Sequence, residues 1–244
     1  MQSTIGAKIV MAVTGFILVG FLVVHMLGNL QVYLGREALN HYAQTLKATP
    51  PLLWGARGVL LVSLIGHVWA ALRLKQINTA ARPRDYAVPR RYRVTTAAAR
   101  FMLLSGAVVL AFIVYHLLHF TVGAVQAENF NLHEIFDVAT QTWAPADNEA
   151  LIKKMPPHLV RHDVYGMFVR GFMNPIVAGS YIVAQLLLGM HLSHAVSSML
   201  HTLGLSKGER ARTRNINIGR TIAAIIVLGN LSFPIAVQAG LVHL

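Results

Sequence analysis

Histidines interrupt the long apolar segments of this 244-residue chain. An ionisable side chain at membrane depth is costly, and by default it marks a functional site. For one isolated histidine, a hydrogen bond to a neighbouring helix is the competing explanation. Histidines on four apolar segments at once favour a shared ligand instead. The histidines in question are His25, His67, His116, His119, His191 and His194.

Position along each segment sorts these histidines into two layers. A helix rises 1.5 Å per residue, and successive segments cross the bilayer in opposite directions. His25 and His116 then lie about 7 and 6 Å to the outer side of the bilayer centre. His67 and His191 lie about 6 and 7 Å to its inner side. Two imidazoles at one height can occupy both axial positions of a haem iron, so the sequence predicts two haems that carry electrons.

Zinc binding and proton relay are weaker interpretations of the same residues. His116 and His119, like His191 and His194, have the i, i+3 spacing that metal ligands can use. However, the chain has no cysteine, and the apolar segments have no carboxylate to complete a tetrahedral zinc site. Proton relays in membranes also usually include carboxylates. Depth favours His116 and His191 over their neighbours as haem ligands.

Small residues precede two of the histidines at a shared interval. Residues 14–15 are Thr-Gly and precede His25, while residues 105–106 are Ser-Gly and precede His116. A flat macrocycle needs small residues where it lies against a helix. The shared spacing therefore supports His25 and His116 as equivalent ligands.

Other polar residues are candidates for contacts with haem propionates or for second-shell roles. His119 and His194 could bond propionates or backbone carbonyls. Asn29 lies one turn beyond His25 and could do the same. Arg57 carries a guanidinium suited to a carboxylate, although snorkelling to the interface is equally compatible with its position.

Composition places the chain in a membrane. Hydrophobic residues make up 55% of it and charged residues 12%, with a mean hydropathy of +0.54. An average soluble domain carries about twice that charged fraction. We predict an all-α fold, a single integral-membrane domain covering residues 1–244. The predicted membrane-spanning helices are residues 8–33, 52–74, 100–125, 171–200 and 218–241.

Basic residues beside these helices predict the orientation. The net charge is +12, but the basic residues gather at helix ends, so we predict no nucleic-acid partner. The connections 73–100 and 204–220 are strongly basic and are expected to face the cytoplasm. The N-terminus is then cytoplasmic and the C-terminus lies outside. The long outer loop 125–170 is expected to form short interfacial helices in segments such as HEIFDVATQTW.

These histidines and their surroundings resemble a known family. The family is the dihaem cytochrome b membrane anchor of succinate:quinone oxidoreductases (succinate dehydrogenase and fumarate reductase), of the single-subunit type with five spans. The resemblance implies that His25 and His116 ligate a distal haem b, and that His67 and His191 ligate a proximal one. The matching stretches are TGFILVGFLVVHMLGNL, NHYAQTL, LIGHVWAALRLKQINTAARPRDY, SGAVVLAFIVYHLLHFT and GMHLSHAVSSMLHTLG.

The resemblance also implies partners and a reaction. In the cell inner membrane, the anchor would bind a flavoprotein and an iron–sulfur subunit on its cytoplasmic face. It would pass electrons between the iron–sulfur subunit and a membrane quinone, expected to be menaquinone. The chain would thus be an enzyme subunit whose dicarboxylate chemistry lies in the flavoprotein. The connections 73–100 and 204–220 could dock the soluble subunits, with anionic lipid as the alternative partner.

One stretch departs from the family. The region AQTLKATPPLLW contains Lys47 and no acid, where some menaquinol-oxidising members carry an acidic residue. This departure leaves the direction of the reaction open. Two other functions remain alternatives: a cytochrome b of hydrogenase, formate dehydrogenase or nitrate reductase, and a non-redox membrane protein.

Overall fold

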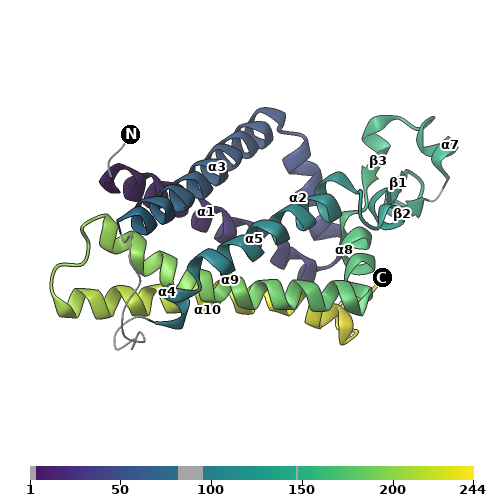
Figure 1. Ribbon diagram of the computed structural model, residues 1–244. Coiled ribbons are helices and arrows are strands. Elements are labelled where there is room, and N and C mark those ends of the chain that lie inside the picture. Colours follow the sequence, from purple (N-terminus) through teal and green to yellow (C-terminus); the bar gives the residue numbers. More distant parts are fainter. Residues whose placement is uncertain (1–3, 82–95, 147) are drawn as a thin grey trace. The chain divides into compact units, whose positions relative to one another are not determined.

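The computed structural model describes residues 4–81, 96–146 and 148–244. The strands are β1 (His133–Asp137), β2 (Thr142–Ala146) and β3 (Val160–His162). The helices are α1 (Thr4–Asn29), α2 (Arg36–Lys47), α3 (Pro50–Ala80), α4 (Ala97–Arg100), α5 (Met102–Leu117), α6 (Ala127–Phe130), α7 (Glu149–Ile152), α8 (Val164–Met173), α9 (Pro175–Thr202) and α10 (Glu209–Gln238) (Figure 1). Short turns of other helix types are η1 (Leu30–Leu34), η2 (Leu118–Val122) and η3 (Pro157–Leu159).

Among the described residues, five helical segments are long and apolar enough to cross a membrane. This finding confirms a multi-pass, predominantly helical membrane protein. The predicted orientation and the choice of membrane stay predictions. The five segments are Thr4–Leu34, Pro50–Ala80, Met102–Val122, Pro175–Thr202 and Glu209–Gln238.

The fourth spanning helix begins later than predicted. The span was predicted to begin at about residue 171, whereas α9 begins at Pro175 and the preceding residues belong to the separate helix α8. Proline suits the first position of a helix, and it disfavours helical backbone at the residue before it. Asn174 is accordingly extended, with ψ 115°. Its side-chain oxygen accepts hydrogen bonds from the backbone amides of Ile176 and Val177 at 3.0 and 3.4 Å.

The fifth spanning helix begins earlier than predicted. The span was predicted to begin at about residue 218, whereas helix α10 begins at Glu209 and includes most of the basic connection 204–220. Arginine and glutamate are good helix formers, and a glutamate in the first turn favours the helix dipole. The other basic connection, 73–100, is described only at its ends, because residues 82–95 lie outside the described residues.

The chain divides into two compact units. Unit 1 comprises Met1–Val24, Trp54–Val109 and Gln185–Leu228, and unit 2 comprises His25–Leu53, Leu110–Ala184 and Gly229–Leu244. Each of the five long helices contributes residues to both units. The core of unit 1 is aliphatic and consists of Leu188, Leu192, Ala223 and Ile226.

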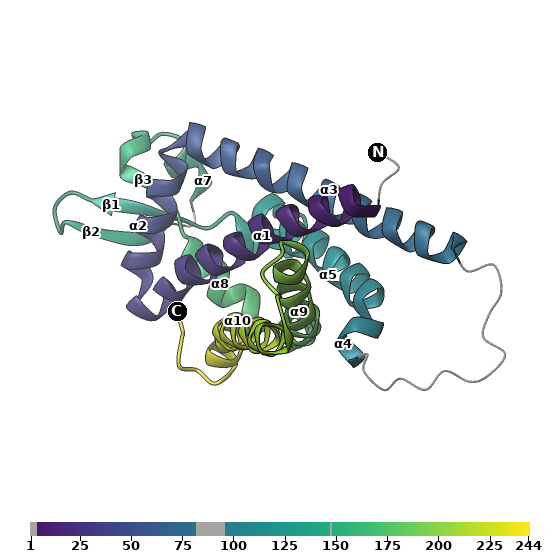
Figure 2. The same ribbon diagram turned by 90° about the vertical axis from the view of Figure 1, so that its left-hand side faces the viewer.

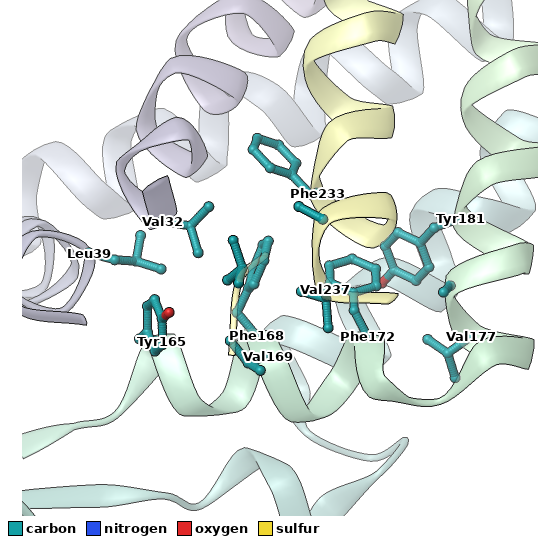
Figure 3. Packing of buried hydrophobic residues seen from close by; sticks show 13 residues of the cluster. Val32, Leu39, Tyr165, Phe168, Val169, Phe172, Val177, Tyr181, Phe233 and Val237 are labelled. Carbon is teal, nitrogen blue, oxygen red and sulfur yellow. The ribbon is translucent and has the colours of Figure 1, made fainter. Parts of the chain in front are cut away.

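The core of unit 2 is rich in aromatic side chains. Phe168 and Phe172 of α8 lie next to each other, with ring centres 5.0 Å apart (Figure 3). Phe172 also meets Tyr181 of α9 edge to face at 4.9 Å. Phe233 of α10 packs against Phe168 at 5.8 Å. Such edge-to-face pairs stabilise a core beyond the area that they bury, so this cluster fixes α8 against α9 and α10.

A small antiparallel sheet occupies part of the segment that was predicted as a loop. The expectation of interfacial helices in HEIFDVATQTW is wrong, because that segment is the β1–β2 hairpin. The strand order is β2-β1-β3, with Glu134 opposite Arg161 and Ile135 opposite Ala144. Isoleucine, phenylalanine, threonine and tryptophan favour a pleated surface. The sheet lies beside α2, which fills much of the connection between the first two spanning helices (Figure 2).

A buried network of charges joins this sheet to α2 and α8. Glu134 is 0% exposed and accepts hydrogen bonds from Arg36, Asn40 and Arg161 at 3.3, 3.0 and 2.7 Å. Asp163 accepts from Arg36 and Asn40 at 2.6 and 2.9 Å. Buried charges need this degree of pairing to offset the loss of hydration. The network therefore holds three elements that are distant in sequence.

Arg161 extends the network to the surface. Its guanidinium donates two hydrogen bonds to Glu37 at 2.9 and 2.5 Å, and it lies 4.2 Å from the ring centre of Trp143. The hydrogen bond from Arg161 lowers the pKa of Glu37. The same contacts with Glu37 and Glu134 raise the pKa of Arg161 although burial opposes the shift. Arg161 is thus held as a permanent cation between two carboxylates.

His162, the last residue of β3, predicts a loss of stability in mild acid. Burial first, and then the charge of Lys47, lower its pKa from 6.5 to about 4, although Asp163 opposes the shift. Both ring nitrogens are buried without a hydrogen-bond partner among the described residues. In the unfolded chain His162 is protonated below about pH 6.5, whereas in the folded chain it stays neutral down to about pH 4. Stability should therefore fall as pH falls through this window, by at most about 1.4 kcal/mol per pH unit.

The measurement is the thermal unfolding midpoint between pH 7.5 and 4, for the wild type and for His162→Gln. The variant should show the shallower pH dependence. The exposed His158 lies nearby in sequence, so His158→Gln is the matched control and should keep the wild-type dependence. Equal slopes for the wild type and His162→Gln would contradict the assignment.

Candidate functional site

In unit 1, the imidazole of His67 is oriented by a threonine. Thr14 Oγ1 lies 3.2 Å from His67 Nδ1. The threonine hydroxyl donates its own proton to the carbonyl of Val10 at 2.7 Å. Its oxygen must therefore accept a proton from Nδ1, which leaves the lone pair on Nε2 of His67. Gly15 lies against the same ring, because a Cβ there would come within 3.4 Å of His67 Cε1.

His191 in the same unit has an equivalent environment. Ser105 Oγ lies 3.2 Å from His191 Nδ1 and donates to the carbonyl of Met102 at 3.2 Å. By the same reasoning, His191 carries its proton on Nδ1 and keeps the lone pair on Nε2. A Cβ at Gly106 would come within 3.3 Å of His191 Cε1. The small residues expected to face a macrocycle thus pack against imidazole rings of other helices.

His67 and His191 are the ligand pair predicted for unit 1. Both are half-buried, and the two imidazoles are near enough to influence each other electrostatically. Both rings donate from a protonated Nδ1 to a hydroxyl on another helix. Nε2 of each ring therefore carries the lone pair that could bind a metal. A metal-binding imidazole typically has this arrangement, because the second-shell acceptor fixes its tautomer and orientation.

Ser105 should matter for stability as well as for orientation. Ser105 is 1% exposed, so Ser105→Ala leaves the Nδ1 proton of His191 without this acceptor. We expect a loss of about 1 kcal/mol of unfolding free energy, measured in detergent. Ser180→Ala is the control, because its hydroxyl donates to the carbonyl of Val177 in its own helix. A change of similar size in both variants would argue against the assigned role of Ser105.

His25 and His116 form a second pair, in unit 2. Their ring centres lie 5.8 Å apart, with an interplanar angle of 88°. An imidazole nitrogen binds a first-row metal at about 2 Å, so one metal between two imidazoles separates the ring centres by about 6 Å. The two rings thus meet edge to face, at a separation that would also accommodate one metal between them.

Tyr181 connects His116 to a third histidine. The tyrosine hydroxyl lies 3.3 Å from Nδ1 of His116 and 3.0 Å from Nδ1 of His119. The remaining nitrogen of His119, Nε2, lies 3.1 Å from Oε1 of Gln126. His119 is 3% exposed and has both ring nitrogens engaged, so it is a poorer candidate for a ligand than His116.

Local backbone geometry places His119 and Gln126. His119 lies in the π-turn η2, and such turns frequently occur at functional sites. Gln126 adopts a left-handed conformation with φ 53°, which is strained for a residue with a side chain, by about 1 kcal/mol or more. Gly171 of α8 leaves room for His119, since a Cβ at 171 would lie 3.1 Å from its Nε2.

Comparison with protein-family models, curated proteins and solved structures finds no match to this chain. The geometry of the histidine pairs therefore carries the functional argument.

The remaining predicted site residues have varied surroundings. Arg57 is exposed, and its guanidinium lies 4.8 Å from the ring centre of Trp54, a cation–π contact. Asn29 ends α1, and its side chain makes no capping hydrogen bond to η1. His194 is half-buried and interacts electrostatically with His191. Contacts of these residues with propionates stay predictions.

The donor set fits haem iron. Each unit holds one pair of imidazoles from different helices, and three of these rings have Nδ1 facing a hydroxyl group. Among the described residues, no group of three or more histidines and acids is placed to hold a metal ion. Each pair could supply the two protein nitrogens that a bis-histidine haem requires. His25, His116, His67 and His191 would hold the two irons.

Sequence reasoning missed Tyr181 and Gln126. Tyr181 is 65 residues from His116, and no local pattern connects the two. The available signal was a tyrosine within an apolar helix, since a buried phenol hydroxyl usually has a polar partner. The hydroxyls of Thr14 and Ser105 were noticed only as parts of small-residue pairs.

Proposed function

We propose that this protein is the haem-b-containing membrane anchor of a succinate dehydrogenase or fumarate reductase. In this role it passes electrons between an iron–sulfur subunit and a membrane quinone through two haems, each bound by two histidines. The observation that carries the proposal is the presence of two imidazole pairs in spanning helices. Of these four rings, those of His67 and His191 present Nε2 with its lone pair, as an iron ligand must.

Haem b, when bound, supplies a one-electron carrier whose potential depends on its ligands and their hydrogen bonds. The residues of this chain have three tasks. The four histidines would hold the two haem irons, two histidines to each. Thr14, Ser105 and Tyr181 fix the orientation of the rings. The apolar helices exclude water, so the potential is governed by these protein groups.

The partners and location follow from the same proposal. The flavoprotein and iron–sulfur subunits would bind on the cytoplasmic side of the inner membrane. Unit 1 contains the basic residues that suit such a contact, including Arg73 and Lys75 near the end of α3 and Arg210 and Arg214 in α10. Arginine and lysine next to spanning helices also face anionic lipid, which would support the same orientation.

The test is a spectrum of the purified protein before and after reduction with dithionite, with haem quantitation. Two b-type haems per chain are expected. Co-purification of a flavoprotein with succinate-dependent reduction of the haems would separate this function from a hydrogenase, formate dehydrogenase or nitrate reductase subunit. A colourless preparation from cells well supplied with haem would overturn the proposal.

A further inference from the structure

A chain of hydrogen bonds leads away from His116 within unit 2. It runs from His116 Nδ1 to the Tyr181 hydroxyl, on to His119 Nδ1, and from His119 Nε2 to Gln126 Oε1. The three separations are 3.3, 3.0 and 3.1 Å. Among the described residues, no corresponding series of hydrogen bonds extends from His67 or His191, whose hydroxyl partners donate to carbonyls of their own helices.

Gln126, at the far end of this series of hydrogen bonds, determines which atom donates and which accepts in each of them. Gln126 Oε1 is only an acceptor, so His119 must donate from Nε2 and accept at Nδ1. Asn129 Nδ2 lies 3.5 Å from the same oxygen, which agrees with this orientation of the amide. Tyr181 then donates to His119, and its oxygen accepts from Nδ1 of His116. The lone pair of His116 is left on Nε2.

We propose that Tyr181, together with His119 and Gln126, fixes the tautomer of His116 and sets the redox potential of the haem bound by His25 and His116. This inference rests on the proposed function. Tyr181 and its two partners are positioning residues, because they act on the iron only through His116. The other haem has ligands with separate partners, Thr14 and Ser105.

The direction of the effect follows from the order of donors. In all three hydrogen bonds the donor is the group nearer to His116. Hydrogen bonds that run in the same direction strengthen each other. An acceptor on Nδ1–H makes the imidazole a more basic ligand, and a more basic ligand stabilises ferric iron. These hydrogen bonds therefore lower the redox potential of this haem, and a variant that interrupts them should raise it. An interruption at Tyr181 should have more effect than one at Gln126.

The first test is a redox titration of the haem-loaded protein with three variants. Tyr181→Phe should raise the potential of one haem and leave the other unchanged, while keeping its ring contacts with Phe172. Gln126→Leu should raise the same potential by a smaller amount. Tyr115→Phe is the matched control, because its ring lies 5.8 Å from those of His119 and Tyr181 but its hydroxyl is not part of the chain. Unchanged potentials in Tyr181→Phe, or equal shifts in Tyr115→Phe, would overturn the inference.

The second test uses nitrogen NMR of histidine in the full chain without haem. The wild type should show His116 protonated on Nδ1, and Tyr181→Phe should show a mixture of both tautomers. A His116 protonated on Nε2 in the wild type would overturn the inference whether or not haem binds. Failure of the chain to bind haem would overturn the proposed function, and the NMR result would still decide whether the hydrogen-bonded chain sets the tautomer.

Discussion

A His25→Ala variant is expected to bind one haem where the wild type binds two, and a His67→Ala variant is expected to lose the other. The reason is geometric. The ring centres of His25 and His116 lie 5.8 Å apart, and under the proposed function these two histidines would share one haem while His67 and His191 would share the other. Alanine removes one of the two imidazoles that would hold the iron, and the partner imidazole alone would hold it weakly. Haem quantitation per chain should fall from two to one in each variant.

The spectra of the two variants should differ from each other, since each variant retains a different haem with its own potential. His41→Ala is the control, because His41 is exposed on α2, outside the five helices long enough to cross a membrane. It should retain both haems. A His119→Ala variant that loses haem as fully as His116→Ala would show that the wrong histidine of that doublet has been assigned. We expect His119→Ala to keep haem with a raised potential.

The spanning helices were predictable because their signal is collective. Each needs about 20 apolar residues, and no single residue decides the result. Helix ends were less predictable because they depend on single residues. Pro175 starts α9 while Asn174 caps it, and Glu209 starts α10 well before the apolar stretch begins. A hydropathy profile does not show where a helix ends when the helix continues beyond the apolar stretch into charged residues.

The sheet was not predictable from the pattern of apolar residues, because a buried charged residue, Glu134, stabilises it. Glu134 occupies a fully buried position in β1, where a strand pattern would have an apolar residue. Its partners Arg36 and Arg161 are 98 and 27 residues away. Only the fold brings these charges together, so the sequence indicated a polar loop.

The candidate histidines could be selected from the sequence because charged and polar residues are rare at membrane depth. Their second-shell partners were not, since serine, threonine and tyrosine are unremarkable in spanning helices. The pairing of Thr14 with His67 crosses 53 residues, and that of Ser105 with His191 crosses 86. Spacing along one helix cannot reveal such contacts, which depend on helix packing.

Replacement of Glu134 should be the most destabilising single change in the region between α5 and α9. Glu134→Ala removes the acceptor of three hydrogen bonds and leaves the side chain of Arg161, 3% exposed, with Glu37 as its remaining carboxylate partner. Removal of one partner from a buried ion pair typically costs about 3–5 kcal/mol. We expect a loss of that size in unfolding free energy, together with faster proteolysis between residues 133 and 162.

Glu149→Ala provides the matched control for this loss. Glu149 also pairs with a cation, Lys153, at 3.4 Å, but its side chain is 80% exposed. An exposed pair contributes about 0–1 kcal/mol, since water solvates both charges when the pair is broken. The two glutamates thus differ in burial and not in charge. If both variants lost the same stability, burial of Glu134 would not be what makes its charge network important, and α2, β1 and α8 would have to be held together by their apolar contacts alone.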